Sequence, residues 1–393
     1  MKPKSCLAPV ILLLLVPCAC TPESLEFVDW TIPVPEGTPV IEYAAVPMEE
    51  RTDRIELVED LVIKQRGDDP NYIFYAPVYT AVDMFGSMYV VDQLDARVQV
   101  FDEHGEFIRT LGKKGQGPGE FNYPLAVAVA GDYIVVNDPT SFRLSVWKSD
   151  GDHLRDRIMG IDRMIDRPMF GTEDGAFIAH YSRRATDPSS PSLHVVARFS
   201  IDGAETLTLG ELKEPSKLTI HTGPVSYWLT SNDMAGVPGY AATSTGLTYL
   251  TTGDEYQVLA LDTQGQARWA LRVAWERAPV TEEDKENRIR KLPKVPPQID
   301  TSRTEWPETF GAISRLSLDG HGRLFVFPQI SSVPRPGEYV PVDVYSPEGE
   351  HLFSGLMESF EWTAASGGFV YGIRENRDSG DQSVIRYRLV EPF

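Results

Sequence analysis

An all-β fold of repeated four-stranded sheets is predicted by eleven short turns that end in glycine and by the apolar runs between them. The two interleaved series of turns end at Gly105, Gly151, Gly203, Gly265 and Gly349, and at Gly86, Gly131, Gly175, Gly246, Gly320 and Gly367. Runs such as Met88–Val91 are rich in β-branched and aromatic residues, which is typical of half-buried antiparallel strands. Glycine supplies the positive φ that a tight hairpin needs.

The clearest unit runs from Tyr79 to Gly112, and a near copy follows from Leu125 to Gly151. The interval between Gly105 and Gly151 has the length of a four-stranded blade. One such sheet cannot bury both of its faces, whereas sheets stacked radially around an axis bury them and leave only short edges. The number of turns therefore predicts a six-bladed β-propeller. A seventh blade is the main alternative, but no pair of turns remains to build it.

The last unit begins with the turn at Gly367 and stops at Phe393 before an outermost strand could form. Residues 54–64 precede the first complete unit where an outer strand would lie, so we expect the start of the chain to close its end. The predicted propeller spans residues 54–393, closed by an N-terminal outer strand, with loop insertions on one face.

The loop between the second and third strands also repeats in the first two units, as Asp92–Arg97 and Asp138–Arg143. The run Gly115–Phe121 follows the first unit. Over residues 75–155 these features resemble the NHL-repeat type of six-bladed propeller, a type common among bacterial exported proteins. The repeated Asp and Arg could line the channel mouth, but we expect them to brace the loops by hydrogen bonds. Residues 115–119 are rich in glycine yet lead into a strand, so we expect an inter-blade turn and no phosphate-binding loop.

The N-terminus has the pattern of an export signal. Lys2 and Lys4 precede an apolar stretch that is too short to span a bilayer. The signal is predicted to cover residues 1–20, and Cys20 resembles the acylated cysteine of bacterial lipoproteins; the alternative is ordinary cleavage and release. All three cysteines lie in this segment, so the mature chain could form no internal disulfide. Residues 21–53 are predicted to be an extended tether of up to about 110 Å at ~3.3 Å per residue.

The long insertions all fall in loops that a propeller places on one face, and this is the face on which we expect the function. The aromatic rings and guanidinium groups there are suited to stacking on sugars and to holding carboxylates or peptides. The predicted ligand-binding residues are Tyr123, Tyr181, Arg183, Trp228 and Arg374. For a single residue such as Trp228, the alternative is that it only anchors its own insertion. Residues 281–291 have the capping pattern of a short surface helix.

Two classes of function are compatible with these features. The first is a membrane-tethered protein of the bacterial cell envelope that binds a glycan, a peptide or a protein partner. The second is a propeller hydrolase or lyase with a divalent metal in the axial channel, although the seven histidines form no short-spaced pair and no catalytic residue or cofactor can be assigned. A net charge of −20 argues against a nucleic-acid or anionic-membrane partner surface.

Overall fold

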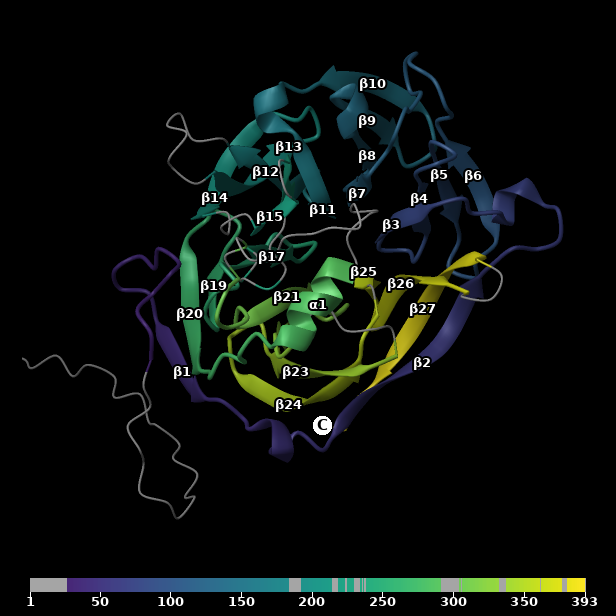
Figure 1. Cartoon of the computed structure of the whole chain (residues 1–393). Coiled ribbons are helices and arrows are strands. Elements are labelled where there is room, and N and C mark those ends of the chain that lie inside the picture. Colours follow the sequence, from purple (N-terminus) through teal and green to yellow (C-terminus); the bar gives the residue numbers. More distant parts are fainter. Residues whose placement is uncertain are drawn as a thin grey trace, which may run out of the picture.

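The chain forms a six-bladed β-propeller, as the sequence predicts. The computed structural model describes residues 27–392 except 184–191, 214–217, 223–224, 230–233, 235, 237, 291–303, 305, 332–336, 361 and 377–379. Figure 1 looks along the propeller, with the inner strand of each blade near the axis and the outer strand at the periphery.

Blades 1 to 3 are consecutive four-stranded antiparallel sheets. Blade 1 contains β3 (Pro77–Val82), β4 (Met88–Asp92), β5 (Arg97–Phe101) and β6 (Phe107–Leu111). Blade 2 contains β7 (Ala126–Ala130), β8 (Tyr133–Asp138), β9 (Arg143–Lys148) and β10 (His153–Ile158). Blade 3 contains β11 (Ile165–Gly171), β12 (Ala176–Arg183), β13 (Leu193–Ser200) and β14 (Glu205–Lys213). A separate hairpin, β15 (Leu218–Thr222) with β16 (Val225–Leu229), precedes blade 4.

Blades 4 to 6 each pair with a strand from the N-terminal segment. One such strand is added to blade 4, and another lies between blades 5 and 6. Blade 4 contains β17 (Gly239–Ala242), β18 (Thr248–Thr251), β19 (Gln257–Leu261) and β20 (Ala267–Ala274). Blade 5 contains β21 (Ile313–Leu318), β22 (Leu324–Pro328), β23 (Tyr339–Tyr345) and β24 (His351–Glu358). Blade 6 contains β25 (Trp362–Ser366), β26 (Phe369–Glu375) and β27 (Gln382–Val390). The helix α1 (Glu282–Arg290) lies between blades 4 and 5 and has the predicted capping by Thr281.

The ring closes through the N-terminal strand β2 (Arg54–Ile63). This strand pairs antiparallel with β27, from Glu56 opposite Val390 to Ile63 opposite Val384. Its first residues also pair with β24 of blade 5. The predicted closure of the last blade by residues 54–64 is therefore confirmed, and the otherwise open edge of β27 is covered.

The predicted tether needs a correction in its second half. β1 (Val40–Ala44) adds a fifth, parallel strand to blade 4 outside β20, and Ile32 is buried. The buried side chain of Arg51 forms a two-pronged ion pair with the buried Asp343, with distances of 2.8 and 3.2 Å. The sequence of this segment lacks a regular period because it follows the edges of existing blades rather than forming a sheet of its own. Residues 1–26, which include the predicted signal and Cys20, lie outside the described residues.

Several of the glycine turns begin with an aspartate that makes the same hydrogen bonds. In the turn that begins at Asp83, the carboxylate accepts hydrogen bonds from the backbone N–H groups of Phe85 and Ser87. Asp102, Asp262 and Asp319 repeat this pattern in other turns. The glycine at the fourth position of these turns has a positive φ, which explains why it recurs.

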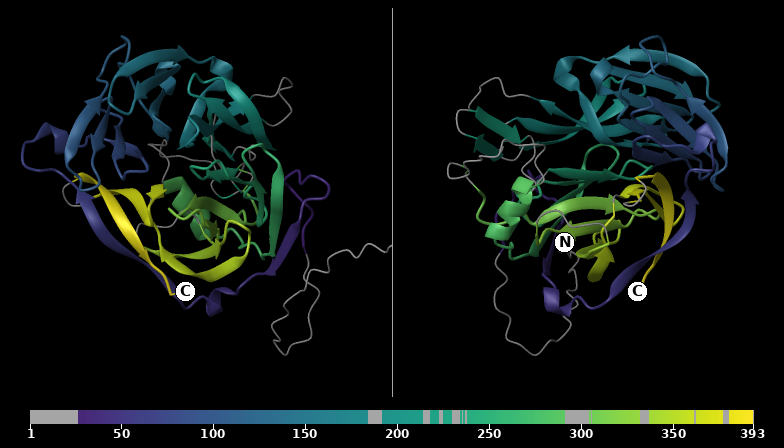
Figure 2. Two further views of the ribbon diagram at one scale, coloured as in Figure 1. Left: turned by 180° about the vertical axis from the view of Figure 1, so that it is seen from behind. Right: turned by 45° about the vertical axis from the view of Figure 1, so that its right-hand side comes forward.

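The two faces of the ring differ. We call the face with the turns at Gly86, Gly131, Gly175, Gly246, Gly320 and Gly367 the short-turn face. The opposite face, which carries the loops between second and third strands and the links between blades, is the long-loop face. The helix α1 belongs to a link on the long-loop face and projects from one side of the ring in Figure 2. No helix in the described ranges is long and apolar enough to cross a membrane.

Candidate functional site

Repeated Asp and Arg residues brace the links of blades 1 and 2. The buried carboxylate of Asp138 accepts hydrogen bonds from the backbone N–H groups of Asn122 and Tyr123, at 2.6 and 3.1 Å. Arg143 donates to the carbonyl oxygens of Gly117 and Glu120 in the same link. Burial alone would raise the pKa of Asp138, but these hydrogen bonds and those from neighbouring hydroxyls lower it.

Asp92 and Arg97 play the same part in blade 1. Asp92 accepts from the backbone of Tyr75 and Ala76, and Arg97 donates to the carbonyl oxygen of Ile73 at 2.7 Å. The interpretation of these pairs as loop braces is confirmed. The glycine-rich run near Gly117 is an inter-blade link, as expected.

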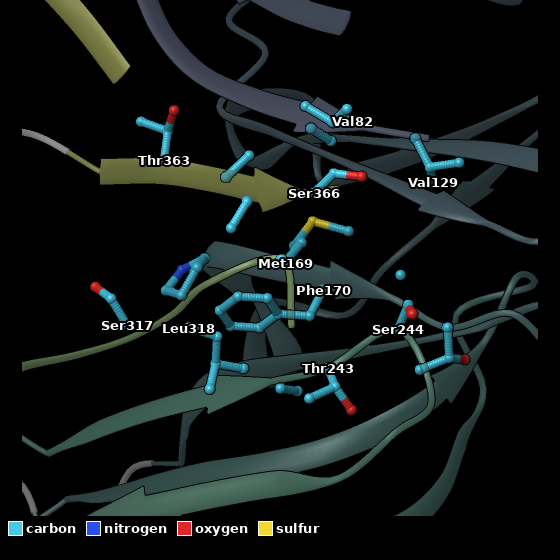
Figure 3. Close-up of a pocket in the computed structure, with 18 of the residues that line it drawn as sticks. Val82, Val129, Met169, Phe170, Thr243, Ser244, Ser317, Leu318, Thr363 and Ser366 are labelled. Atoms are coloured by element: carbon cyan, nitrogen blue, oxygen red, sulfur yellow. The ribbon is translucent and has the colours of Figure 1, made fainter. Parts of the chain in front are cut away.

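A cavity of about 1370 Å³ occupies the axis of the propeller. All six inner strands contribute to its wall, and Figure 3 shows their side chains facing a common space. At one end the cavity reaches the short turns, with Gly131, Thr245 and Gly367 in its lining. At the other end it reaches Asp166 and Pro238, on the side of the long loops. A ligand therefore has a route into the axis from the short-turn face.

The wall combines hydroxyl and apolar groups along its length. The labelled hydroxyls in Figure 3 come from Thr243, Ser244, Ser317, Thr363 and Ser366, and the labelled apolar side chains from Val82, Val129, Met169, Phe170 and Leu318. Phe170 is half-buried and meets Tyr240 edge to face, with ring centroids 5.6 Å apart. Its ring thus offers a partly open apolar surface among groups that donate and accept hydrogen bonds.

A pair of histidines lines the long-loop end of the cavity. The rings of His180 and His194 stack with centroids 3.8 Å apart, and Nδ1 of His180 lies 3.2 Å from the hydroxyl of Tyr240. Burial, with the imidazole of His194, lowers the pKa of His180 well below its usual value. Burial also raises the pKa of the Tyr79 hydroxyl to about 12 in the same wall, where it donates to the carbonyl oxygen of Met169. At neutral pH both side chains are therefore uncharged.

Charged groups lie at the mouth and also along the wall, where Asp166, Arg167 and Arg315 line the cavity. Asp132 and Glu173 are exposed on the turns of blades 2 and 3, and Arg268 is exposed on blade 4. On the turn of blade 1, Met84 and Phe85 are 83% and 76% exposed, which is unusual for side chains of this kind. A ligand thus passes a polar rim with one apolar projection before it reaches Phe170 and the hydroxyl groups of the wall.

The residues predicted to bind a ligand do not form one site. Tyr181 is buried in the core of blades 1 to 3, and its hydroxyl donates to Glu205 at 3.0 Å, so its assignment to an open surface was wrong. Six consecutive residues of β12, Ala176–Tyr181, are buried because neighbouring blades cover both faces of this sheet, and Tyr181 is the last of them. Arg183 lies on the same strand near the long-loop face and pairs with Glu211 at 2.7 Å.

The other predicted residues lie apart from one another. Arg374 in β26 pairs with Glu59 of β2 beside a separate cavity of about 400 Å³ at the edge of blade 6. Tyr123 is 41% exposed in the link before blade 2. Trp228 belongs to β16, and its side chain lies outside the described part of the structure. A site on the long-loop face that uses Tyr123, Arg183, Trp228 and Arg374 stays a prediction.

Sequence reasoning considered the axial channel only as a metal site and missed its lining residues, because they lie on the inner strands of six blades, far apart in the chain. One signal was available. Inner strands such as β17 and β25 carry small hydroxyl or alanine residues where a close-packed core would carry Leu or Ile. Among the described residues, no group of three His, Cys, Asp or Glu side chains comes together in a way that could hold a metal ion.

Comparisons with known proteins agree with the fold. Residues 78–152 match the DUF5128 family, described as a 6-bladed beta-propeller. A protein from Bacteroides fragilis, described as exported, shares 11% identity with a TM-score of 0.52, over 90% of this chain and 99% of its own. A DUF4221-family member from Bacteroides vulgatus shares 12% identity with a TM-score of 0.53, over 86% of this chain and 99% of its own. No curated protein matches the sequence. At these identities the structural likeness concerns the fold alone.

Proposed function

We propose that this chain is an exported binding protein, tethered to the bacterial cell envelope through acylated Cys20, whose ligand enters the axial channel from the short-turn face. The ligand is a glycan, a peptide or a segment of a protein partner. The observation that supports this proposal most is the cavity, whose half-buried Phe170 lies among hydroxyl groups. A large concave pocket with an apolar surface and a few convergent polar groups is the usual form of a binding site.

Export and tethering rest on the N-terminal pattern. A basic start, a short apolar core and Ala19-Cys20 occur in that order. The structurally similar protein from Bacteroides fragilis is described as exported, which is consistent with export of this chain. Metabolic labelling with a radioactive fatty acid tests the anchor: the wild type should be labelled and Cys20→Ser should not. An unlabelled wild type would contradict acylation.

The ligand site is tested by screening the soluble mature chain against a glycan array and a peptide library. For any ligand retained by the wild type, Phe170→Ala should weaken binding by about 1–2 kcal/mol, or roughly tenfold, because a stacking surface is lost. His104→Ala is the control, since this exposed side chain lies on an outer turn away from the cavity lining. A loss from Arg183→Ala, with Phe170→Ala unchanged, would instead place the site on the long-loop face.

A further inference from the structure

The described chain begins at the long-loop end of blade 4. The side-chain amide of Gln257, the first residue of β19, accepts from the backbone N–H of Thr31 at 2.8 Å and donates to the carbonyl oxygen of Asp29 at 3.0 Å. The hydroxyl groups of Thr31 and Thr252 lie 2.7 Å apart in the same place. The guanidinium of Arg272 covers the ring of Phe27 at 4.6 Å. Residues 27–31 are therefore attached to blade 4 beside the loop that leads into β19.

This attachment shortens any tether. Only seven peptide steps separate Phe27 from Cys20, and at about 3.3–3.6 Å per residue they span at most about 25 Å. If Cys20 carries the lipid, as we propose above, the long-loop end of blade 4 stays within that distance of the bilayer surface. The sequence alone had allowed about four times as much, because residues 27–53 were counted as free chain.

The same face exposes apolar side chains over blades 1 to 3. Six large apolar residues in its loops, links and strand ends are 39% to 78% exposed. They are Tyr75, Leu94, Tyr123, Ile158, Ile161 and Met164. We call this set the apolar loop patch. Single exposed apolar residues are ordinary, but here they recur at the tips of successive links that carry no long insertion.

Two positions of the apolar loop patch are held in place by the loop braces. The backbone N–H groups of Tyr75 and Tyr123 both donate to buried carboxylates, those of Asp92 and Asp138. These two tyrosines therefore project from rigid links at equivalent points of neighbouring blades. Tyrosine and aliphatic side chains on a fixed surface are suited to the boundary between water and lipid.

The charges around the apolar loop patch do not oppose a lipid surface. Glu120 is paired with Lys113 and Asp95 with Arg97, so these acids are locally compensated. Lys114, in the same link as Tyr123, is exposed. Lysine beside exposed aromatic rings favours the headgroup region, whereas the overall charge of −20 prevents deep adsorption on anionic lipid.

We infer that the apolar loop patch rests on the surface of the membrane that carries the lipid anchor, with the short-turn face and the mouth of the axial channel turned away. The partner of this surface is the lipid headgroup region itself. The proposed acylation of Cys20 sets only the distance from the bilayer surface. The exposed side chains determine which face is turned toward the membrane. Ligands then reach the channel from the aqueous side without passing the bilayer.

The test uses single-cysteine reporters on the mature chain, which has no thiol other than Cys20. A fluorophore is attached at Tyr123→Cys on the long-loop face or at His104→Cys on the short-turn face. The acylated protein is reconstituted into vesicles of phosphatidylethanolamine and phosphatidylcholine that contain a nitroxide headgroup quencher. The label at position 123 should be quenched several-fold more strongly than the label at 104. Adding Ile161→Asp to the first reporter should reduce its quenching.

A second anchor separates this inference from the proposal of acylation. In a parallel form, a hexahistidine segment replaces Cys20 and binds vesicles that carry nickel-chelating lipid. Stronger quenching at 123 with this form supports the membrane-facing surface even if the native chain proves to be unacylated. Equal quenching at both positions with the nickel-chelating anchor, or stronger quenching at 104 with either anchor, overturns the inference. If Ile161→Asp leaves the quenching at position 123 unaltered, this result also counts against the apolar loop patch.

Discussion

Removal of Arg51 tests whether the N-terminal segment is an integral part of the propeller. Its guanidinium makes two hydrogen bonds to Asp343, a third to the carbonyl oxygen of Val342 and a fourth to that of Val46. Both charged side chains are at most 3% exposed. In Arg51→Met the carboxylate of Asp343 would stay buried, with the hydroxyls of Tyr256 and Ser354 as its remaining donors.

The expected cost follows from that burial. Breaking a buried ion pair from one side costs about 3–5 kcal/mol, because an uncompensated charge stays in the interior. With about 2.1 cal/mol/K of unfolding entropy per residue, 4 kcal/mol corresponds to a fall of about 5 °C in Tm for a chain of this size that unfolds in one step. The comparison is Arg66→Met, which breaks the exposed pair with Glu106 and should cost less than about 1 kcal/mol.

Urea denaturation of Arg51→Met, Asp343→Asn and the double variant measures the coupling. The double variant should be less destabilised than the sum of the two single variants, since it leaves no unpaired buried charge. A cost for Arg51→Met no larger than that for Arg66→Met, or strict additivity, would refute the argument that this segment is held by a buried ion pair.

Three further predictions concern the blades. Asp138→Asn should lower the free energy of unfolding by about 2–4 kcal/mol at pH 7, because five donor groups lose a charged acceptor. Since folding lowers the pKa of Asp138, the wild type holds this stability above the unfolded pKa and loses it as pH falls through the folded pKa. Urea curves of both proteins at pH 7 and about pH 3 should therefore converge in acid; a constant gap would contradict this. Gly171→Ala should strongly destabilise the protein, because its Cβ would lie 1.7 Å from the carbonyl oxygen of Val129. In Gly210→Ala the added Cβ would meet only the end of the Leu250 side chain, so this variant should lower Tm much less than Gly171→Ala when thermal unfolding of both is measured. Deleting residues 54–63 should expose the edge of β27, lower Tm and promote association, which light scattering measures; a deletion variant that melts as late and as cooperatively as the wild type would disprove closure by β2.

Part of the candidate site could be read from the sequence and part could not. The braces Asp92 with Arg97 and Asp138 with Arg143 were predictable, because they repeat at a fixed offset and act within one link. Tyr181 was misplaced because an aromatic residue at the end of a strand has the same local pattern whether it faces the core or a loop. Only its contact with Phe199 and Glu205 distinguishes these cases.

The turns, the blade count and the closure by residues 54–64 are properties of the sequence itself. The turns and the blade count depend on local chemistry, since glycine with positive φ and strands of alternating apolar residues repeat at a regular period. The closure followed from that count, since the last unit lacks an outer strand and residues 54–64 precede the first complete unit. The axial cavity and the attachment of residues 27–51 were decided only by the tertiary structure. Phe170 and Ser317 come to line one cavity through ring closure, and Arg51 pairs with Asp343 across nearly three hundred residues. Such contacts arise from the geometry of six stacked sheets, which no single stretch of the sequence encodes.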